Sequence, residues 1–183
     1  MQHGKAEGTI EHAGTTYKFT GYGVHERIIQ SGIVPDRTRF MGNRGLGWIQ
    51  SWGEKLSFYV MKGDVGENAA TGILYVGDEC YAVEAEKIHV EETLYWLDPK
   101  SKINIPYRWK VVFETPAGRL QAEVYAYGRG YYTWLRRHGT MVVNQYTADA
   151  AVKLTQKDGT VLEEKHQSMV EHMRTLYRQP EQR

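Results

Sequence analysis

The sequence predicts an all-β protein, an antiparallel barrel followed by a C-terminal helix. Short segments in which apolar and polar residues alternate recur along the chain, as is typical of half-buried strands. Turn sequences rich in glycine, proline, asparagine and aspartate separate these segments. Many short strands with few helices are typical of a sandwich or a closed barrel. We favour the barrel, because closure removes sheet edges and about eight strands can enclose one small ligand.

Successive segments pair naturally as hairpins around short turns. The first pair comprises Gly8 to His12 and Thr16 to Ile29, on either side of Ala13-Gly14. The later expected strands are residues 48–52, 56–61, 73–76, 81–90, 107–115, 120–127, 131–134 and 141–154.

Two segments depart from this strand pattern. Residues 30–47 combine glycine, arginine, proline and aspartate without apolar periodicity, which predicts a long loop that could act as a lid. In residues 162–177 the apolar positions fall near helical spacing, so we expect a C-terminal helix there, with a strand followed by a helix as the alternative.

Composition limits the class of protein. A chain of 183 residues is long enough for a single domain with a sizeable core. The formal net charge of +1 gives no global field for nucleic acid or anionic membranes. The single cysteine, Cys80, excludes an intramolecular disulfide, and no apolar run reaches membrane-spanning length. We therefore expect a cytoplasmic protein with no nucleic-acid or membrane partner.

The first hairpin carries a recognisable motif. Residues 21–26 read Gly-Tyr-Gly-Val-His-Glu, preceded by Gly-Thr-Ile-Glu at 8–11 and Gly-Thr-Thr-Tyr at 14–17. This pattern resembles the lipocalin-like hydratase superfamily, which includes carotenoid 1,2-hydratases and AttH-like proteins. The resemblance implies a lipocalin-like barrel, a hydrophobic and often isoprenoid substrate, and an acidic residue facing the cavity. Such relatives commonly pair two halves, so a homodimer of this shorter chain is a reasonable hypothesis.

Two neighbouring residues are the candidate acid/base groups. The resemblance selects Glu26, whereas strand alternation places His25 on the face of Tyr17 and Phe19. A β-bulge at one of the intervening glycines would reverse the two directions, so both residues stay candidates. The alternative is a surface Glu26 paired with a cation.

Aromatic residues supply the expected ligand cavity. Thirteen tyrosines and five tryptophans are an unusual number for this length, and such side chains offer apolar walls with polar tips. Each one alone is more simply explained as core packing. The candidate substrate-binding residues are Trp48, Trp52, Tyr75, Tyr81, Tyr107, Trp109, Tyr125 and Tyr127.

The sequence favours an enzyme that uses no cofactor and no metal. The seven histidines match no recognised metal-ligand spacing, and the glycine-rich residues 42–47 match no phosphate-binding or dinucleotide-binding motif. We expect hydration, isomerisation or cyclisation of a small hydrophobic, isoprenoid or polyketide-like molecule, as a lyase or an isomerase/cyclase. The alternative is a non-catalytic carrier of a lipophilic or aromatic ligand.

Overall fold

The computed structural model describes residues 2–25, 46–63, 70–136 and 139–178. The chain forms two compact units, Met1–Pro35 and Asp36–Arg183.

The first unit contains a long antiparallel hairpin. Strands β1 (Gln2–His12) and β2 (Thr15–His25) are joined at Ala13 and Gly14, whose φ angles are 49° and 75°. Positive φ at both central positions is the geometry of a tight hairpin turn, and glycine adopts it at little cost. The expected hairpin is therefore confirmed. Pairing runs without a register shift from Gln2 opposite His25 to His12 opposite Thr15, so the possible β-bulge at Gly21 or Gly23 is absent.

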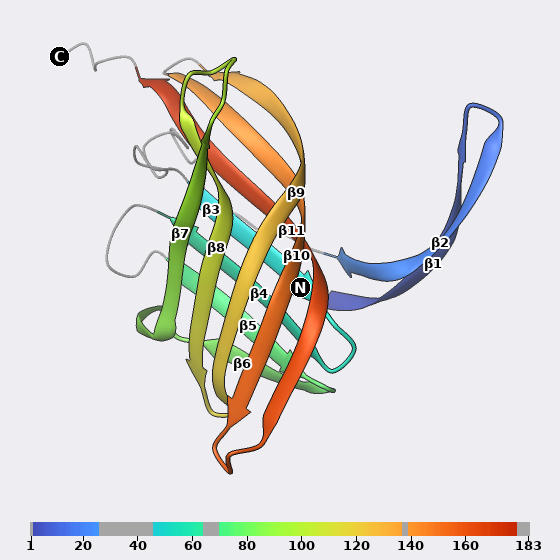
Figure 1. Ribbon diagram of the computed structural model, residues 1–183, viewed down its shortest axis with the longest axis vertical. Coiled ribbons are helices and arrows are strands. Elements are labelled where there is room, and N and C mark those ends of the chain that lie inside the picture. The colour runs from blue at the N-terminus through green and yellow to red at the C-terminus, as the bar shows by residue number, and fades with distance from the viewer. Residues whose placement is uncertain (1, 26–45, 64–69, 137–138, 179–183) are drawn as a thin grey trace, which may run out of the picture. The chain divides into compact units, whose positions relative to one another are not determined.

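The second unit is one curled antiparallel sheet of nine strands (Figure 1), in the order β6-β5-β4-β3-β11-β10-β9-β8-β7. The strands are β3 (Leu46–Trp52), β4 (Leu56–Gly63), β5 (Ala70–Val76), β6 (Glu79–Val83), β7 (Ile88–Leu97), β8 (Asn104–Thr115), β9 (Gly118–Arg136), β10 (Gly139–Gln156) and β11 (Val161–Arg178).

The described strands form a half-barrel rather than a closed ring. Strands β6 and β7 follow each other in the chain across the short 3-10 helix η1 (Ala85–Lys87), yet they form the two opposite edges of the sheet. Curling brings these edges near each other, since β6 contacts β8. The prediction of an antiparallel all-β fold is confirmed, whereas the described strands do not form the predicted closed barrel.

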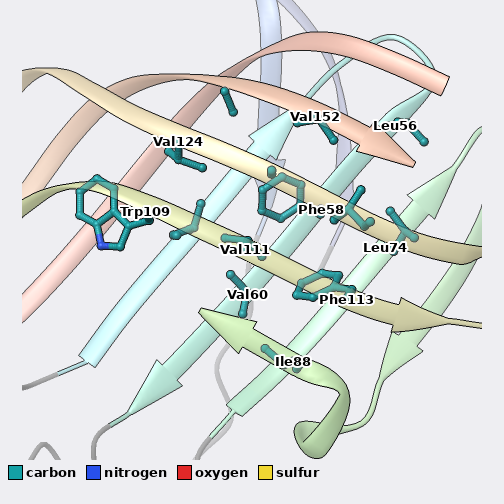
Figure 2. Close-up of a cluster of buried hydrophobic side chains, with 14 of the residues drawn as sticks. Leu56, Phe58, Val60, Leu74, Ile88, Trp109, Val111, Phe113, Val124 and Val152 are labelled. Atoms are coloured by element: carbon teal, nitrogen blue, oxygen red, sulfur yellow. The ribbon is translucent and has the colours of Figure 1, made fainter. Parts of the chain in front are cut away.

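The inner face of the curl holds the hydrophobic core (Figure 2). Phe58 of β4, Leu74 of β5 and Phe113 of β8 are almost completely buried there, and the rings of Phe58 and Phe113 meet edge to face with centroids 5.9 Å apart. Gly72 allows this packing, because a Cβ at that position would stand 3.1 Å from the Phe113 ring. Strands from both sides of the sheet thus share one core.

The predicted C-terminal helix at 162–177 is wrong, because this segment is strand β11. It pairs with β10 along its length and with β3 on its other side. The apolar residues that suggested a helix come from both faces of the strand: Leu162 packs against the core, whereas Met169 is exposed. Even-numbered residues, among them His166, Ser168, Val170 and His172, alternate inward and are buried. Polar inward residues concealed this period of two.

Most of the other strand expectations are confirmed, with two changes of boundary. The segment expected at 81–90 is divided by η1 into β6 and the start of β7. The segments expected at 120–127 and 131–134 are one strand, β9, which contains a bulge.

Candidate functional site

A cavity of about 520 Å³ opens inside the half-barrel, beyond the packed core. Strands β3, β4, β7, β8 and β11 form its wall, so residues far apart in the sequence meet there. Its lining residues are Gly47, Ile49, Val60, Lys62, Gly63, Val90, Glu91, Glu92, Tyr95, Trp109 and Arg174. The wall therefore combines apolar side chains with a few charged groups, as small-molecule sites usually do.

A carboxylate and an imidazole form the central pair of this site. Oε1 of Glu92 lies 3.2 Å from Nε2 of His172, and the Tyr95 hydroxyl donates a 2.9 Å hydrogen bond to Oε2. Burial opposes ionisation of Glu92, but the bonds from His172 and Tyr95 and the charge of Arg174 outweigh it and lower its pKa. Glu92 is consequently a carboxylate at neutral pH, on the wall of a cavity that combines apolar and polar groups.

Strand geometry brings the two groups together. Glu92 pairs with Trp109 of β8, and a register irregularity begins directly after it. His172 is buried on the inner face of β11, two residues after the core residue Val170. Its Nδ1 atom is buried without a hydrogen-bond partner among the described residues. If Nε2 carries the proton toward Glu92, Nδ1 is an unoccupied acceptor.

A bulge in β9 turns a cation toward the same end of the sheet. Thr147 pairs with Gly128 and Ala148 pairs with Ala126, which leaves Tyr127 as the extra residue. A bulge of this kind reverses the alternation of side chains beyond it. Arg129 therefore shares the inner face of β10, where it donates to Oδ1 of Asn144 from Nε at 2.9 Å.

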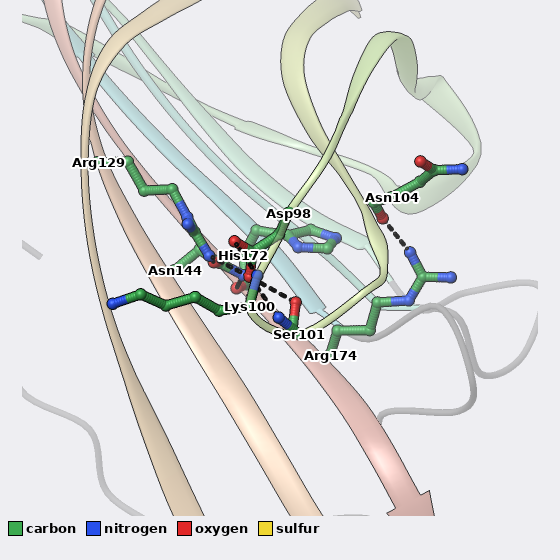
Figure 3. Close-up of polar contacts among 8 residues, drawn as sticks. All are labelled: Asp98, Lys100, Ser101, Asn104, Arg129, Asn144, His172 and Arg174. Carbon is green, nitrogen blue, oxygen red and sulfur yellow. Dashed lines mark hydrogen bonds and ion pairs between the residues drawn. The ribbon is translucent and has the colours of Figure 1, made fainter.

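Asn144 and Asp98 hold this arginine beside His172 (Figure 3). Asn144 also donates to the carbonyl oxygen of His172 at 3.2 Å, so it connects β9 to β11. Asp98 lies 3.5 Å from the Arg129 guanidinium and accepts hydrogen bonds from the Ser101 hydroxyl and backbone. These bonds outweigh burial and lower the pKa of Asp98 to about 2. The acid is thus an ionised support for the arginine.

Tyr146 adds a buried hydroxyl to this end of the sheet. Its ring packs edge to face on Trp109 with centroids 5.4 Å apart. Its Oη atom has no hydrogen-bond partner among the described residues, and burial raises its pKa above the ordinary tyrosine value. The phenol is neutral at physiological pH, so its hydroxyl can donate and accept a hydrogen bond.

A second polar cluster, Ser51, Glu164 and His166, has a different role. Ser51 Oγ lies 2.9 Å from Nδ1 of His166, whose Nε2 lies 3.3 Å from Glu164. The composition is that of a hydrolytic triad, but Ser51 and His166 are fully buried and do not line the cavity. Glu164 accepts hydrogen bonds from the backbone N–H groups of Lys55 and Leu56, so the cluster fixes the β3–β4 turn. Burial lowers the pKa of His166 and keeps it neutral.

Of the eight aromatic residues proposed for the cavity, Trp109 lines it. The indole of Trp48 packs on Tyr59, Tyr107 packs on Tyr125, and Tyr81 lies against the core cluster. The remaining predicted residues do not line this cavity either: Trp52 and Tyr75 are half-buried on their strands, and Tyr125 and Tyr127 are mostly exposed.

The acid/base candidates from the motif are placed differently. His25 is the last residue of β2, and its side chain is not described. Glu26 and most of the expected lid at 30–47 lie outside the described residues. Sequence reasoning missed Glu92 and His172, because they are eighty positions apart and neither forms a local motif. The alternation of β11 was the one signal that could have indicated an inward His172, and its polar inward residues concealed it.

Among the described residues, no group of three or more His, Cys, Asp and Glu side chains is arranged to hold a metal ion. None of the described helical structure is long and apolar enough to cross a bilayer. Comparisons with protein-family models, with curated proteins and with solved structures found no match.

Proposed function

We propose that this protein is a cofactor-independent enzyme that binds a small hydrophobic molecule inside its half-barrel and moves protons to and from it. The observation that carries the proposal is the ionised Glu92 on a cavity wall that also contains Ile49, Val60, Val90 and Trp109. A partly buried carboxylate beside these apolar side chains is available as a general base. The proposal includes the lipocalin-like barrel and the relationship to hydratases that the sequence resemblance implies, although the reaction that we propose for Glu92 is an isomerisation.

Proton abstraction suits Glu92 better than protonation of an alkene. Donating a proton would need a carboxyl group with a raised pKa, whereas the pKa of Glu92 is lowered. The expected reaction is therefore an isomerisation. Glu92 removes a proton from carbon, the electron pair of the C–H bond shifts the double bond, and the resulting carboxylic acid, after exchanging its proton with solvent, protonates another carbon. His172 positions the carboxylate through Oε1, and Tyr95 through Oε2.

Solvent deuterium provides the test. The protein is incubated in D₂O with a panel of β,γ-unsaturated ketones and isoprenoid alkenes, and the recovered compounds are analysed by mass spectrometry. We expect deuterium in at least one compound with the wild type and a loss of about 100-fold or more in Glu92→Gln. His172→Asn should retain part of the rate. The rate should fall on acidification only below the ordinary pKa of glutamate, because protonation removes the base.

A matched variant separates this site from the motif residues. If Glu26→Gln or His25→Asn abolishes exchange while Glu92→Gln does not, the acid/base group is in the motif and the assignment to Glu92 fails. Unchanged exchange in all three variants would rule out both assignments.

A carrier is the second candidate, and one observation favours it. Both carboxylate oxygens of Glu92 already have protein partners, as in a pair that only completes the wall. A carrier would return every bound compound without deuterium, and Glu92→Gln would change binding but no chemistry.

A further inference from the structure

Two cations line the cavity without a carboxylate partner among the described residues. Nζ of Lys62 donates to the carbonyl oxygen of Val90 at 3.2 Å, and Arg174 donates to the carbonyl oxygen of Asn104 at 2.5 Å. Both side chains belong to the cavity wall. An ammonium has three N–H donors and a guanidinium has five, so each cation keeps donors for another acceptor.

The carboxylates of the wall do not neutralise these cations directly. Glu92 is bonded to His172 and Tyr95, and Arg174 acts on it only through its charge. Glu91 is exposed and lies opposite Lys110 in the β7–β8 register, on the strand face away from Glu92. The two cations of the wall therefore keep donors for a ligand, while Glu92 is already bonded and Glu91, which also belongs to the lining, is exposed.

A glycine leaves room beside the cations. Lys62, Gly47 and His172 lie opposite one another in register across β4, β3 and β11. Neighbouring strands are about 4.8 Å apart, so this row crosses the cavity floor within about 10 Å. Gly47 has no side chain, and the nearest atom to a Cβ built there is the Lys62 carbonyl oxygen at 3.9 Å. A larger residue at position 47 would fill the space between Lys62 and His172.

We propose that the ligand is an amphipathic carboxylate. Its carboxylate group binds Lys62 and Arg174, and its apolar body lies against Ile49, Val60 and Trp109. Charge-assisted hydrogen bonds to an anion are roughly twice as strong as neutral ones, and they fix the orientation of the molecule before Glu92 acts on it. This inference rests on the proposed function for the cavity and adds the chemical class of its ligand.

Calorimetric titration with octanoate and 1-octanol tests the inference, since the two probes share an apolar chain and differ in the head group. We expect octanoate to bind at least about tenfold more tightly than 1-octanol. Lys62→Met and Arg174→Met should each weaken octanoate binding about tenfold and leave 1-octanol binding unchanged. Lys110→Met, on an exposed position of β8, is the matched control and should change neither.

Gly47→Leu locates the binding and distinguishes the possible failures. It should abolish binding of both probes, because it fills the cavity. Equal affinities of the wild type for octanoate and 1-octanol, both lost in Gly47→Leu, would reject the carboxylate inference and retain the cavity. Equal weakening of both probes by Lys62→Met would reject it as well. If the wild type binds neither octanoate nor 1-octanol, the inference and the proposed function are both rejected.

Discussion

At the scale of single residues, close packing around the β3–β4 turn leaves no room for a side chain at Gly53. A Cβ built there would stand 2.3 Å from Nε2 of His166 and 2.6 Å from Glu164. Both neighbours are held in place, His166 by Ser51 and Glu164 by the backbone of Lys55 and Leu56. The glycine is required by this approach and not by its backbone conformation.

Gly53→Ala should therefore destabilise the protein. The added methyl group must displace the imidazole or the carboxylate, which breaks their contact and leaves buried polar atoms without partners. We expect a loss of about 2 kcal/mol in the free energy of unfolding, measured by urea denaturation. Gly130→Ala is the control, because a Cβ there meets no atom within 4 Å. Equal stability of the two variants would show that the cluster rearranges freely.

At the scale of elements, the sequence predicted strands well where one face was apolar and the other polar. Trp109, Val111 and Phe113 made β8 evident in this way. The same logic failed for β11, whose inward residues include two histidines and a serine. Alternation also could not predict the site, because Glu92 and His172 lie on β7 and β11, which three strands separate in the sheet, and the two residues meet only because the sheet curls. Local pattern determines strands, whereas the curl of the sheet determines which polar residues meet.

The bulge in β9 is the element on which Arg129 depends. Deleting Tyr127 would restore simple alternation, turn Arg129 outward, and leave Asn144 and Asp98 buried without their cation. We expect a loss of about 3 kcal/mol or more in the free energy of unfolding, as for other broken buried pairs. Tyr127→Ala keeps the bulge and removes a side chain that is 63% exposed, so it should cost less than about 0.5 kcal/mol. A deletion variant as stable as Tyr127→Ala would contradict this role.

At the scale of the nine-stranded unit, stability and proposed chemistry occupy different parts of the half-barrel. Phe58, Leu74 and Phe113 fill one region with apolar side chains, and Glu92, His172 and the Arg129 network occupy another. Buried polar pairs contribute little net stability compared with apolar residues of similar volume. A fold retains such a pair at a cavity most readily when the pair has a function.

Replacing the central pair by apolar residues tests this division. The double variant Glu92→Met with His172→Leu should unfold within about 1 kcal/mol of the wild type, or be more stable, because no charge is left unpaired. Asn144 bonds the backbone carbonyl of His172, so its contact survives the substitution. The single variant His172→Leu should be less stable than the double variant, since Glu92 then loses its imidazole partner.

Phe113→Ala provides the comparison, and should cost about 3 to 5 kcal/mol because it opens a cavity in the core. Urea unfolding of all three variants, combined with the deuterium-exchange assay, separates the two roles. The double variant should lose exchange while keeping its stability. If it instead loses as much stability as Phe113→Ala, the Glu92–His172 pair is a structural element of the half-barrel, and the functional assignment loses its support.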